Sequence, residues 1–233
     1  MRGAGFRIQC APGPGSLCLL FCVMLHLLPI SLPLQAYAIE LRDSLSGLQN
    51  RYASVQTVKG NFQQIYRAPG IRRDESGEFW LKKPGLMRWE YHSPEEQLFV
   101  ADGRESFLYI PRDRQVTVQP LSAADLHNTP FELLLGPGSI EKNYSVSWEK
   151  EFKPTAERTL LIRLTPRRQA QYSFLVLEMD SEDFEIRRIL TREPTGSTSE
   201  FLLSSVTTNV KLDDKLFRFK IPKGSEVIRM KSE

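Results

Sequence analysis

The chain has 233 residues, a length typical of one domain, and its 31 basic side chains are nearly balanced by 28 acidic ones. Such a balance does not favour nucleic acid or an acidic polymer as a partner, so we expect no nucleic-acid binding. The three cysteines, Cys10, Cys18 and Cys22, all precede residue 38. The chain beyond them therefore has no disulfide, no thiol nucleophile and no thiolate metal site.

The first 38 residues have the pattern of a secretory signal. Two arginines precede the apolar run Leu17–Leu28, and residues 36–38 read Ala-Tyr-Ala, a typical cleavage site. A transmembrane anchor is the alternative, but two prolines interrupt the apolar segment, and the run is shorter than the roughly 20 residues that a spanning helix needs. We expect residues 1–38 to be removed and residues 39–233 to form a single domain.

A helix is predicted at Ile39–Val55, because one stripe of apolar residues recurs there at steps of three and four. The pattern then changes to a period of two, typical of strands separated by turns. Strands are predicted at Val58–Tyr66, Gly77–Lys82, Met87–Tyr91, Gln97–Ala101, Ser106–Ile110, Gln115–Pro120, Tyr144–Trp148, Thr159–Thr165, Tyr172–Met179, Ile186–Thr191, Ser199–Thr208 and Arg218–Ile221. Since no helices alternate with these strands, the sequence favours a large antiparallel sheet that curls toward a barrel.

One segment, Asp125–Gly138, interrupts the strands. Thr129 can cap a helix, Pro130 suits its first position, and Glu132 follows three residues after Thr129, which makes a capping box. Gly136 would end the helix. We expect a very short helix that carries Phe131, Leu133, Leu134 and Leu135.

The sequence offers little for catalysis. After residue 38 there are only two histidines, His92 and His127, and they are not spaced as metal ligands. There is no serine in a G-x-S-x-G elbow and no nucleotide-binding glycine loop. The carboxylates at Asp180, Glu182 and Asp183 have the pattern of a solvated loop. We therefore predict no enzyme activity, no cofactor and no metal site.

The distinctive segment is GEFWLKKPGLMRWEY at residues 77–91, a hairpin with an unusual number of large apolar side chains. A two-residue loop at Pro84-Gly85 would mix charged and apolar side chains on each face. A loop with an odd number of residues shifts the register by one and gathers the apolar ones on one face, namely Phe79, Leu81, Met87, Trp89 and Tyr91. The odd loop is therefore favoured. The apolar face is either ordinary core under the first helix, the commoner case, or the wall of a ligand cavity.

The order of these segments resembles the LolA family of periplasmic lipoprotein carriers. The resemblance extends over Leu41–Val227 and is strongest in residues 77–91, LFVADGRESFLYIP at 98–111, NTPFELLL at 128–135 and FRFKIPKGSEVI at 217–228. It implies an α+β fold, mainly β, in which an unclosed antiparallel β-barrel and a short helical lid enclose an apolar cavity. The implied acyl-chain site comprises Phe62, Phe79, Leu81, Met87, Trp89 and Tyr91, and the implied lid comprises Pro130, Phe131 and Leu134.

The resemblance also implies partners. Acylated lipoproteins would arrive from an inner-membrane ABC transporter of the LolCDE type and leave to an outer-membrane receptor of the LolB type, carried through the periplasm by a monomer. The sequence departs from the family at Lys83, where an arginine usually latches the lid, and a lysine is not equivalent to it. Three alternatives remain: a carrier of another periplasmic lipid, a lipid- or peptide-sensing regulator domain, and a lipid hydrolase.

Overall fold

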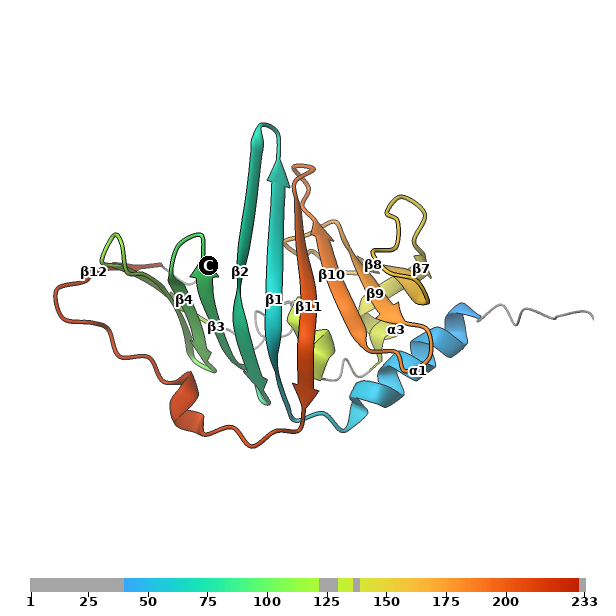
Figure 1. Cartoon of the computed structure of the whole chain (residues 1–233), viewed down its shortest axis with the longest axis horizontal. Helices are drawn as coiled ribbons and strands as arrows, with labels where there is room; N and C mark the ends of the chain where they lie inside the picture. The colour runs from blue at the N-terminus through green and yellow to red at the C-terminus, as the bar shows by residue number, and fades with distance from the viewer. Residues whose placement is uncertain (1–39, 122–129, 136–138, 231–233) are drawn as a thin grey trace, which may run out of the picture. The chain divides into compact units, whose positions relative to one another are not determined.

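The structure is a computed structural model that describes residues 40–121, 130–135 and 139–230. Within these residues lies one 12-stranded sheet with the order β12-β6-β5-β4-β3-β2-β1-β11-β10-β9-β8-β7 (Figure 1). The strands are β1 Thr57–Ala68, β2 Ile71–Lys82, β3 Leu86–Ser93, β4 Gln97–Asp102, β5 Glu105–Ile110, β6 Gln115–Pro120, β7 Tyr144–Trp148, β8 Thr159–Pro166, β9 Phe174–Asp180, β10 Ile186–Arg192, β11 Thr198–Thr208 and β12 Glu226–Arg229. Within β1 to β6 and within β7 to β11, each strand pairs antiparallel with the next along the chain, and β1 pairs antiparallel with β11 in the centre.

In the described part of the chain, four short or medium helices accompany the sheet: α1 Leu41–Ala53, η1 Pro130–Leu135, α3 Ile140–Asn143 and η2 Asp214–Phe217. The predicted helix Ile39–Val55 is confirmed in α1, which ends two residues before the predicted end, and Val55 is buried in the core between the helix and β1. The predicted lid helix is a 3-10 helix, η1. Its predicted cap at Thr129 and stop at Gly136 lie outside the described residues.

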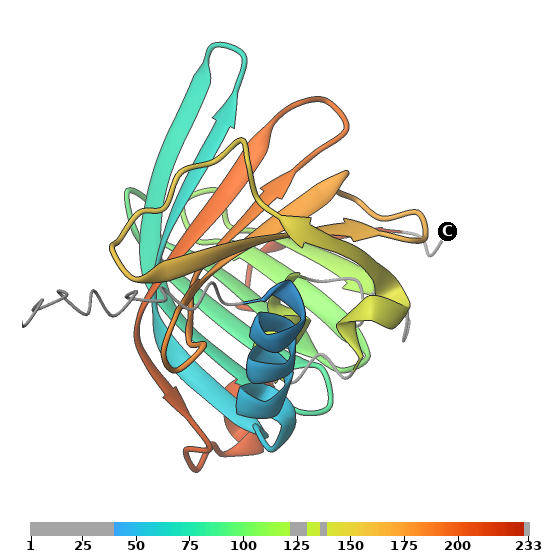
Figure 2. The same ribbon diagram turned by 90° about the vertical axis from the view of Figure 1, so that its right-hand side faces the viewer.

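The sheet curls so that one face is concave, and α1 lies on that concave side (Figure 2). The apolar stripe of α1 packs there, with Leu45, Leu48 and Tyr52 buried in one cluster with the inner side chains of the strands and with η1. The Tyr52 hydroxyl accepts a hydrogen bond of 3.1 Å from the backbone N–H of Ile186 in β10, which fixes the helix to that half of the sheet. The α+β half-barrel expected from the resemblance is thus the observed fold.

The hairpin of β2 and β3 has the register that the sequence favoured. Leu81 pairs with Met87 and Phe79 with Trp89, so the three residues from Lys83 to Gly85 form an odd loop. Gly85 has a φ of 70°, a left-handed conformation that favours glycine at this turn. All four paired side chains therefore share the concave face.

One predicted strand is wrong. Residues Arg218–Ile221 are not in a strand; instead Phe219 and Ile221 pack on Phe107 and neighbouring valines on the outer face of β5 and β6. The last strand is β12, eight residues beyond the start of the predicted one, and it pairs parallel to β6. The apolar alternation in this segment comes from packing onto a sheet face, which gives the same sequence pattern as a strand.

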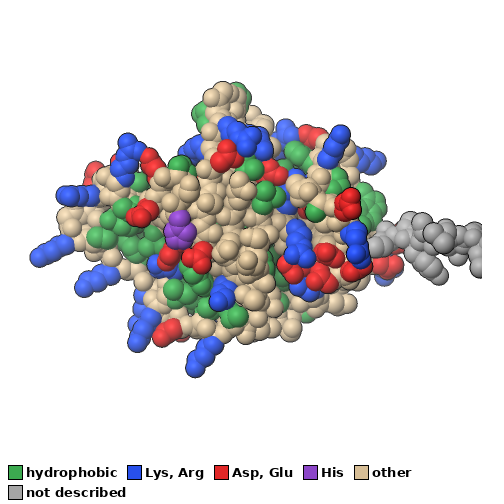
Figure 3. Space-filling model, viewed as in Figure 1, with side chains coloured by type: hydrophobic (Ala, Val, Ile, Leu, Met, Phe, Trp, Pro, Cys, Tyr) green, Lys and Arg blue, Asp and Glu red, His purple; other side chains and the backbone are tan. Residues whose placement is uncertain are grey.

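The outer surface is polar and mixed in charge. On the side of the molecule shown in Figure 3, Lys and Arg side chains are interspersed with Asp and Glu side chains. Among the described residues, no helix is both long and apolar enough to cross a membrane. The predicted signal segment lies outside the described residues, so its removal stays a prediction.

Candidate functional site

The inner face of the β1–β2 hairpin changes from apolar to polar along its length. Its inward side chains form five cross-strand pairs, namely Val58–Leu81, Gly60–Phe79, Phe62–Gly77, Gln64–Glu75 and Tyr66–Arg73. The first three pairs lie where the sheet curls over the core, and their residues are apolar or glycine. The last two pairs lie toward the hairpin tip, where Glu75 is half-buried and Arg73 is exposed. A single ladder thus connects the core to a polar end.

Two glycines in this ladder make room for the two phenylalanine rings. A Cβ on Gly60 would lie 3.0 Å from the ring of Phe79, and one on Gly77 would lie 3.0 Å from the ring of Phe62. At Gly77 the same Cβ would also lie 1.8 Å from the carbonyl oxygen of Glu90. Each ring therefore covers the glycine opposite, and a side chain at Gly77 is excluded by the backbone of β3.

Aromatic side chains form a continuous cluster on this face. The ring of Trp89 lies 4.9 Å from both Phe62 and Phe79, edge-on to the first and stacked on the second. From η1, the ring of Phe131 lies 4.3 Å from Trp89 and 4.8 Å from Phe201 of β11. Such pairs contribute about 0.5–1.5 kcal/mol each beyond their burial. They connect η1 to the sheet.

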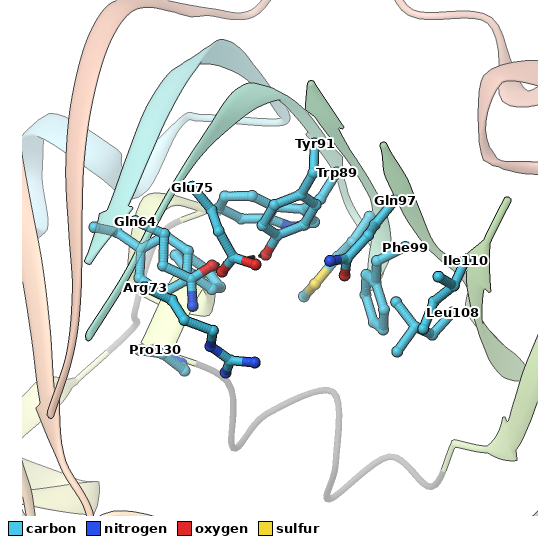
Figure 4. Close-up of a pocket in the computed structure, with 13 residues that line it drawn as sticks. Gln64, Arg73, Glu75, Trp89, Tyr91, Gln97, Phe99, Leu108, Ile110 and Pro130 are labelled. Carbon is cyan, nitrogen blue, oxygen red and sulfur yellow. Dashed lines mark hydrogen bonds between the residues drawn. The ribbon is translucent and has the colours of Figure 1, made fainter. Parts of the chain in front are cut away.

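A pocket of about 540 Å³ opens beside this cluster (Figure 4), within the range of roughly 300–1,000 Å³ typical of small-molecule sites. Its walls come from β1 to β5, β11 and the first residues of η1. Five of the predicted site residues line it: Met87, Trp89, Tyr91, Pro130 and Phe131. The other four, Phe62, Phe79, Leu81 and Leu134, are buried in the core cluster, which also includes Met87 and Trp89. Met87 and Trp89 thus belong both to the core and to the pocket wall.

Sequence reasoning missed part of the pocket wall. The missed residues are Gln64, Arg73, Glu75, Gln97, Phe99, Leu108, Ile110 and Phe201. Strand parity could have found some of them, because Phe99 pairs with both Trp89 and Leu108 in neighbouring hairpins. The polar residues were missed because the hairpin strands extend further than the apolar pattern does, so β2 begins at Ile71 and not at the predicted Gly77.

The described part of η1 is held by apolar packing. Leu133, Leu134 and Leu135 are all buried in the main core cluster. Next to this helix, the side chain of Gln49 in α1 accepts a hydrogen bond of 3.0 Å from the backbone N–H of Ile140. These contacts join η1, α1 and the sheet in one packed unit.

Lys83 lies half-buried in the β2–β3 turn, where its backbone N–H donates to the carbonyl oxygen of Gln56. Its side chain makes no hydrogen bond or ion pair with the described residues. The lid segment that it would latch, residues 128–135, begins outside those residues. The role of Lys83 as a latch therefore stays a prediction.

The pocket provides hydrogen-bonding groups at one end. The hydroxyl of Tyr91 donates to the side-chain oxygen of Gln64 over 2.9 Å. Burial, together with the nearby carboxylate of Glu75, raises the pKa of Tyr91, so the hydroxyl stays protonated. No group of three or more His, Cys, Asp or Glu side chains that could hold a metal occurs in the described residues. The site therefore offers an apolar wall with a polar end.

An open sheet that curls around an apolar pocket, with a helix on the concave side and a short helix over the aromatic wall, defines a half-barrel of the ligand-binding kind. Residues 53–220 match the family model described as "Outer membrane lipoprotein carrier protein LolA". The chain belongs to this family.

Individual relatives support the same family assignment. The chain is 32% identical over 190 residues to an outer-membrane lipoprotein carrier protein of Hahella chejuensis, with 80% of this chain and 87% of the relative covered. It is 30% identical over 213 residues to a protein of the same name from Nitrosomonas europaea, with 91% and 98% covered. An uncharacterized conserved protein from Thermus thermophilus has a similar fold, with a TM-score of 0.50, 12% identity, and 81% of this chain and 98% of that chain covered.

Proposed function

We propose that the protein carries acylated lipoproteins between membranes, with their acyl chains in the pocket beside Trp89. The observation that carries this proposal is the continuity of the pocket with the aromatic cluster that η1 covers. Apolar wall residues face the pocket from β3, β4 and β5, among them Met87, Phe99 and Leu108. Family membership supports the same substrate class, since the relatives are named as lipoprotein carriers.

The free energies involved require such a shielded site. Each buried methylene contributes about 0.8 kcal/mol, so the long acyl chains of a lipoprotein could not cross water unprotected. The present pocket is suited to a small ligand, and several long chains need more room than it offers. Displacement of Phe131 and the rest of η1 would join the pocket to the apolar face beneath.

The position of η1 also explains how the carrier would release its ligand. In this structure, η1 occupies apolar surface that a ligand would otherwise contact. Opening it uses part of the binding free energy, so the net affinity is lower than that of a permanently open cavity. A carrier needs this compromise, because very tight binding would prevent transfer to the next acceptor.

The proposal includes a route and a place. The protein would act in the periplasm as a monomer, receiving lipoproteins from an ABC transporter of the LolCDE type and giving them to a receptor of the LolB type. It would catalyse no reaction, since the pocket offers binding groups only. The predicted secretory signal supports the periplasmic location.

Binding of a defined ligand tests the proposal. The purified protein is titrated with a fluorescent triacylated lipopeptide, and with the same peptide without its acyl chains as the control. We expect saturable one-to-one binding of the acylated peptide alone, with protection of the Trp89 region from hydrogen exchange. Equal binding of both peptides, or binding of neither, would contradict it.

A further inference from the structure

The polar end of the pocket is formed by two charged side chains on one strand, Arg73 and Glu75. Both line the pocket, and in Figure 4 they lie with Gln64 on one side of it, while Phe99, Leu108 and Ile110 lie on the opposite side. Neither charged group makes a hydrogen bond or ion pair with the part of the chain that the structure describes. The guanidinium of Arg73 lies 4.9 Å over the ring of Tyr66.

The other polar groups at this end are already engaged with each other. The hydroxyl of Tyr91 donates to Gln64, and the side-chain nitrogen of Gln64 donates to the hydroxyl of Ser199 over 3.1 Å. Arg73 and Glu75 are the charged residues that line the pocket, and they offer donors on the first and acceptors on the second, in addition to the amide of Gln97.

The positions of Arg73 and Glu75 along the β1–β2 hairpin determine how deep in the pocket each charge lies. Successive inward pairs are about 7 Å apart along a strand, since each residue rises by about 3.4 Å. Glu75 lies one step beyond the last apolar pair, Phe62–Gly77, and Arg73 lies two steps beyond it. A ligand whose hydrocarbon fills the apolar part would place its polar linkage beside Glu75 first.

We propose that Arg73 and Glu75 form a selectivity subsite, in which Arg73 donates to the ester or amide carbonyls of the ligand, and Glu75 accepts from an amide N–H and disfavours an anionic phospholipid headgroup. This inference deepens the proposed function and rests on it. Ester and amide carbonyls accept from Arg73, and an amide N–H donates to Glu75. A phospholipid has the same ester carbonyls, but its phosphodiester has no hydrogen to donate to Glu75, and its charge is repelled by that carboxylate and attracted by Arg73.

Such selectivity has a clear use. A carrier that collects ligands at a phospholipid membrane meets diacyl lipids in large excess over lipoproteins. The apolar wall cannot distinguish them, because their acyl chains have the same chemistry. The two differ beyond the shared esters, where a phospholipid has an anionic phosphodiester and an acylated protein has a neutral amide, and Glu75 lines the polar end of the pocket.

Two ligands that differ only in the phosphate headgroup test the subsite: dioctanoylglycerol and dioctanoyl phosphatidylglycerol. The affinity ratio of this pair is measured by calorimetry at low and high salt for the wild type, Glu75→Gln and Arg73→Gln. We expect Glu75→Gln to shift the ratio toward phosphatidylglycerol by about fivefold to tenfold at low salt, and Arg73→Gln to shift it the other way. A general defect in the pocket would change both affinities together and leave the ratio unchanged.

Glu78→Gln is the matched control, because Glu78 lies on the same strand with its side chain on the outer face. It should leave the ratio at the wild-type value. An unchanged ratio in Glu75→Gln, a shift of both pocket variants in one direction, or an equal shift in Glu78→Gln would overturn the subsite. Failure of the lipopeptide to bind in the earlier titration would instead overturn the proposed function, since the two-lipid ratio does not depend on it.

Discussion

The ring of Phe131 lies 4.3 Å from the ring of Trp89, centre to centre, at an angle of 49°. One residue comes from η1 and the other from the middle of β3, and both line the pocket. This contact joins the proposed lid to the proposed acyl-chain wall. Movement of η1 would therefore uncover Trp89 directly.

Replacement of Phe131 by alanine tests this relationship. In Phe131→Ala we expect faster hydrogen exchange in η1 and tighter binding of the triacylated lipopeptide, because the closed empty state is less stable. The free energy of unfolding should fall by about 1–2 kcal/mol, less than for a fully buried phenylalanine. Phe174→Ala is the control, since Phe174 is also half-buried but lies on the outer face beside Arg163. Slower exchange or weaker binding in Phe131→Ala would contradict the role as a lid.

A charge on the pocket wall tests the apolar site. Met87 is buried and lines the pocket, so the carboxylate of Met87→Glu would face the acyl chains at a cost of several kcal/mol unless water reaches it. We expect lipopeptide binding to weaken by at least about tenfold while the protein stays folded. Met230→Glu, at an exposed methionine, should bind normally.

The result also separates two roles for Met87. If Met87 acts only in the core, its variant should unfold at a markedly lower temperature, with binding reduced only in proportion to the unfolded fraction. A folded variant with normal binding would contradict both the pocket role and the core role.

The latch prediction concerns the turn before β3. We expect Lys83→Arg to slow hydrogen exchange in Phe131–Leu135 and Lys83→Leu to speed it. One hydrogen bond to a charged group contributes about 1.5–3 kcal/mol, and even the lower value changes the open fraction about tenfold. Lys82→Arg is the control, because the Lys82 ammonium pairs with Asp214 on the outer side. Unchanged hydrogen exchange in both variants would contradict the latch and would mean that Lys83 is an ordinary turn lysine.

The architecture was predictable from the sequence because its strands alternate in period two and are joined by recognisable turns. The β2–β3 register followed from one requirement, that Phe79, Leu81, Met87 and Trp89 share a face. The last strand was not predictable. Phe219 and Ile221 alternate like strand residues but pack flat on the outer face of the sheet, and β12 owes its place to parallel pairing with β6.

The site was predictable only in its apolar part. Trp89 and Phe131 are unusual residues in a recognisable pattern, and they lie in the pocket. Arg73 and Glu75 belong to a polar extension of the hairpin, where no apolar alternation indicates which side chains turn inward. Their position depends on the pairing of Gln64 with Glu75 and of Tyr66 with Arg73, which only the folded sheet provides.

Low pH should reduce the stability of the protein through a carboxylate on the outer face of the sheet near β7. Burial disfavours the charged form of Glu149, but hydrogen bonds from Arg163 and from the backbone N–H groups of residues 150–152 outweigh it and lower the pKa to about 2. A lowered pKa stabilises the folded state fully above the ordinary value near 4.5, and this stabilisation is lost as the pH falls toward 2. Because solvent at Arg163 screens this interaction, we expect it to contribute about 1–2 kcal/mol to the free energy of unfolding.

Urea unfolding of Glu149→Gln measures this contribution. The variant should be less stable than the wild type at neutral pH, and the difference should shrink as the pH falls below 4.5. Glu226→Gln, at an exposed position of β12, should have the same free energy of unfolding as the wild type at every pH. A difference that stays constant with pH would mean that packing, and not the charge of Glu149, is responsible.

In the proposed function, the pocket beside Trp89 carries the acyl chains of lipoproteins. Native mass spectrometry of the protein isolated from the periplasm, without detergent, tests it most directly, because the bound molecule is weighed with its carrier. We expect complexes with one triacylated protein each, and their loss in Met87→Glu but not in Met230→Glu. A phospholipid, a glycolipid or another free lipid as the bound molecule would contradict it.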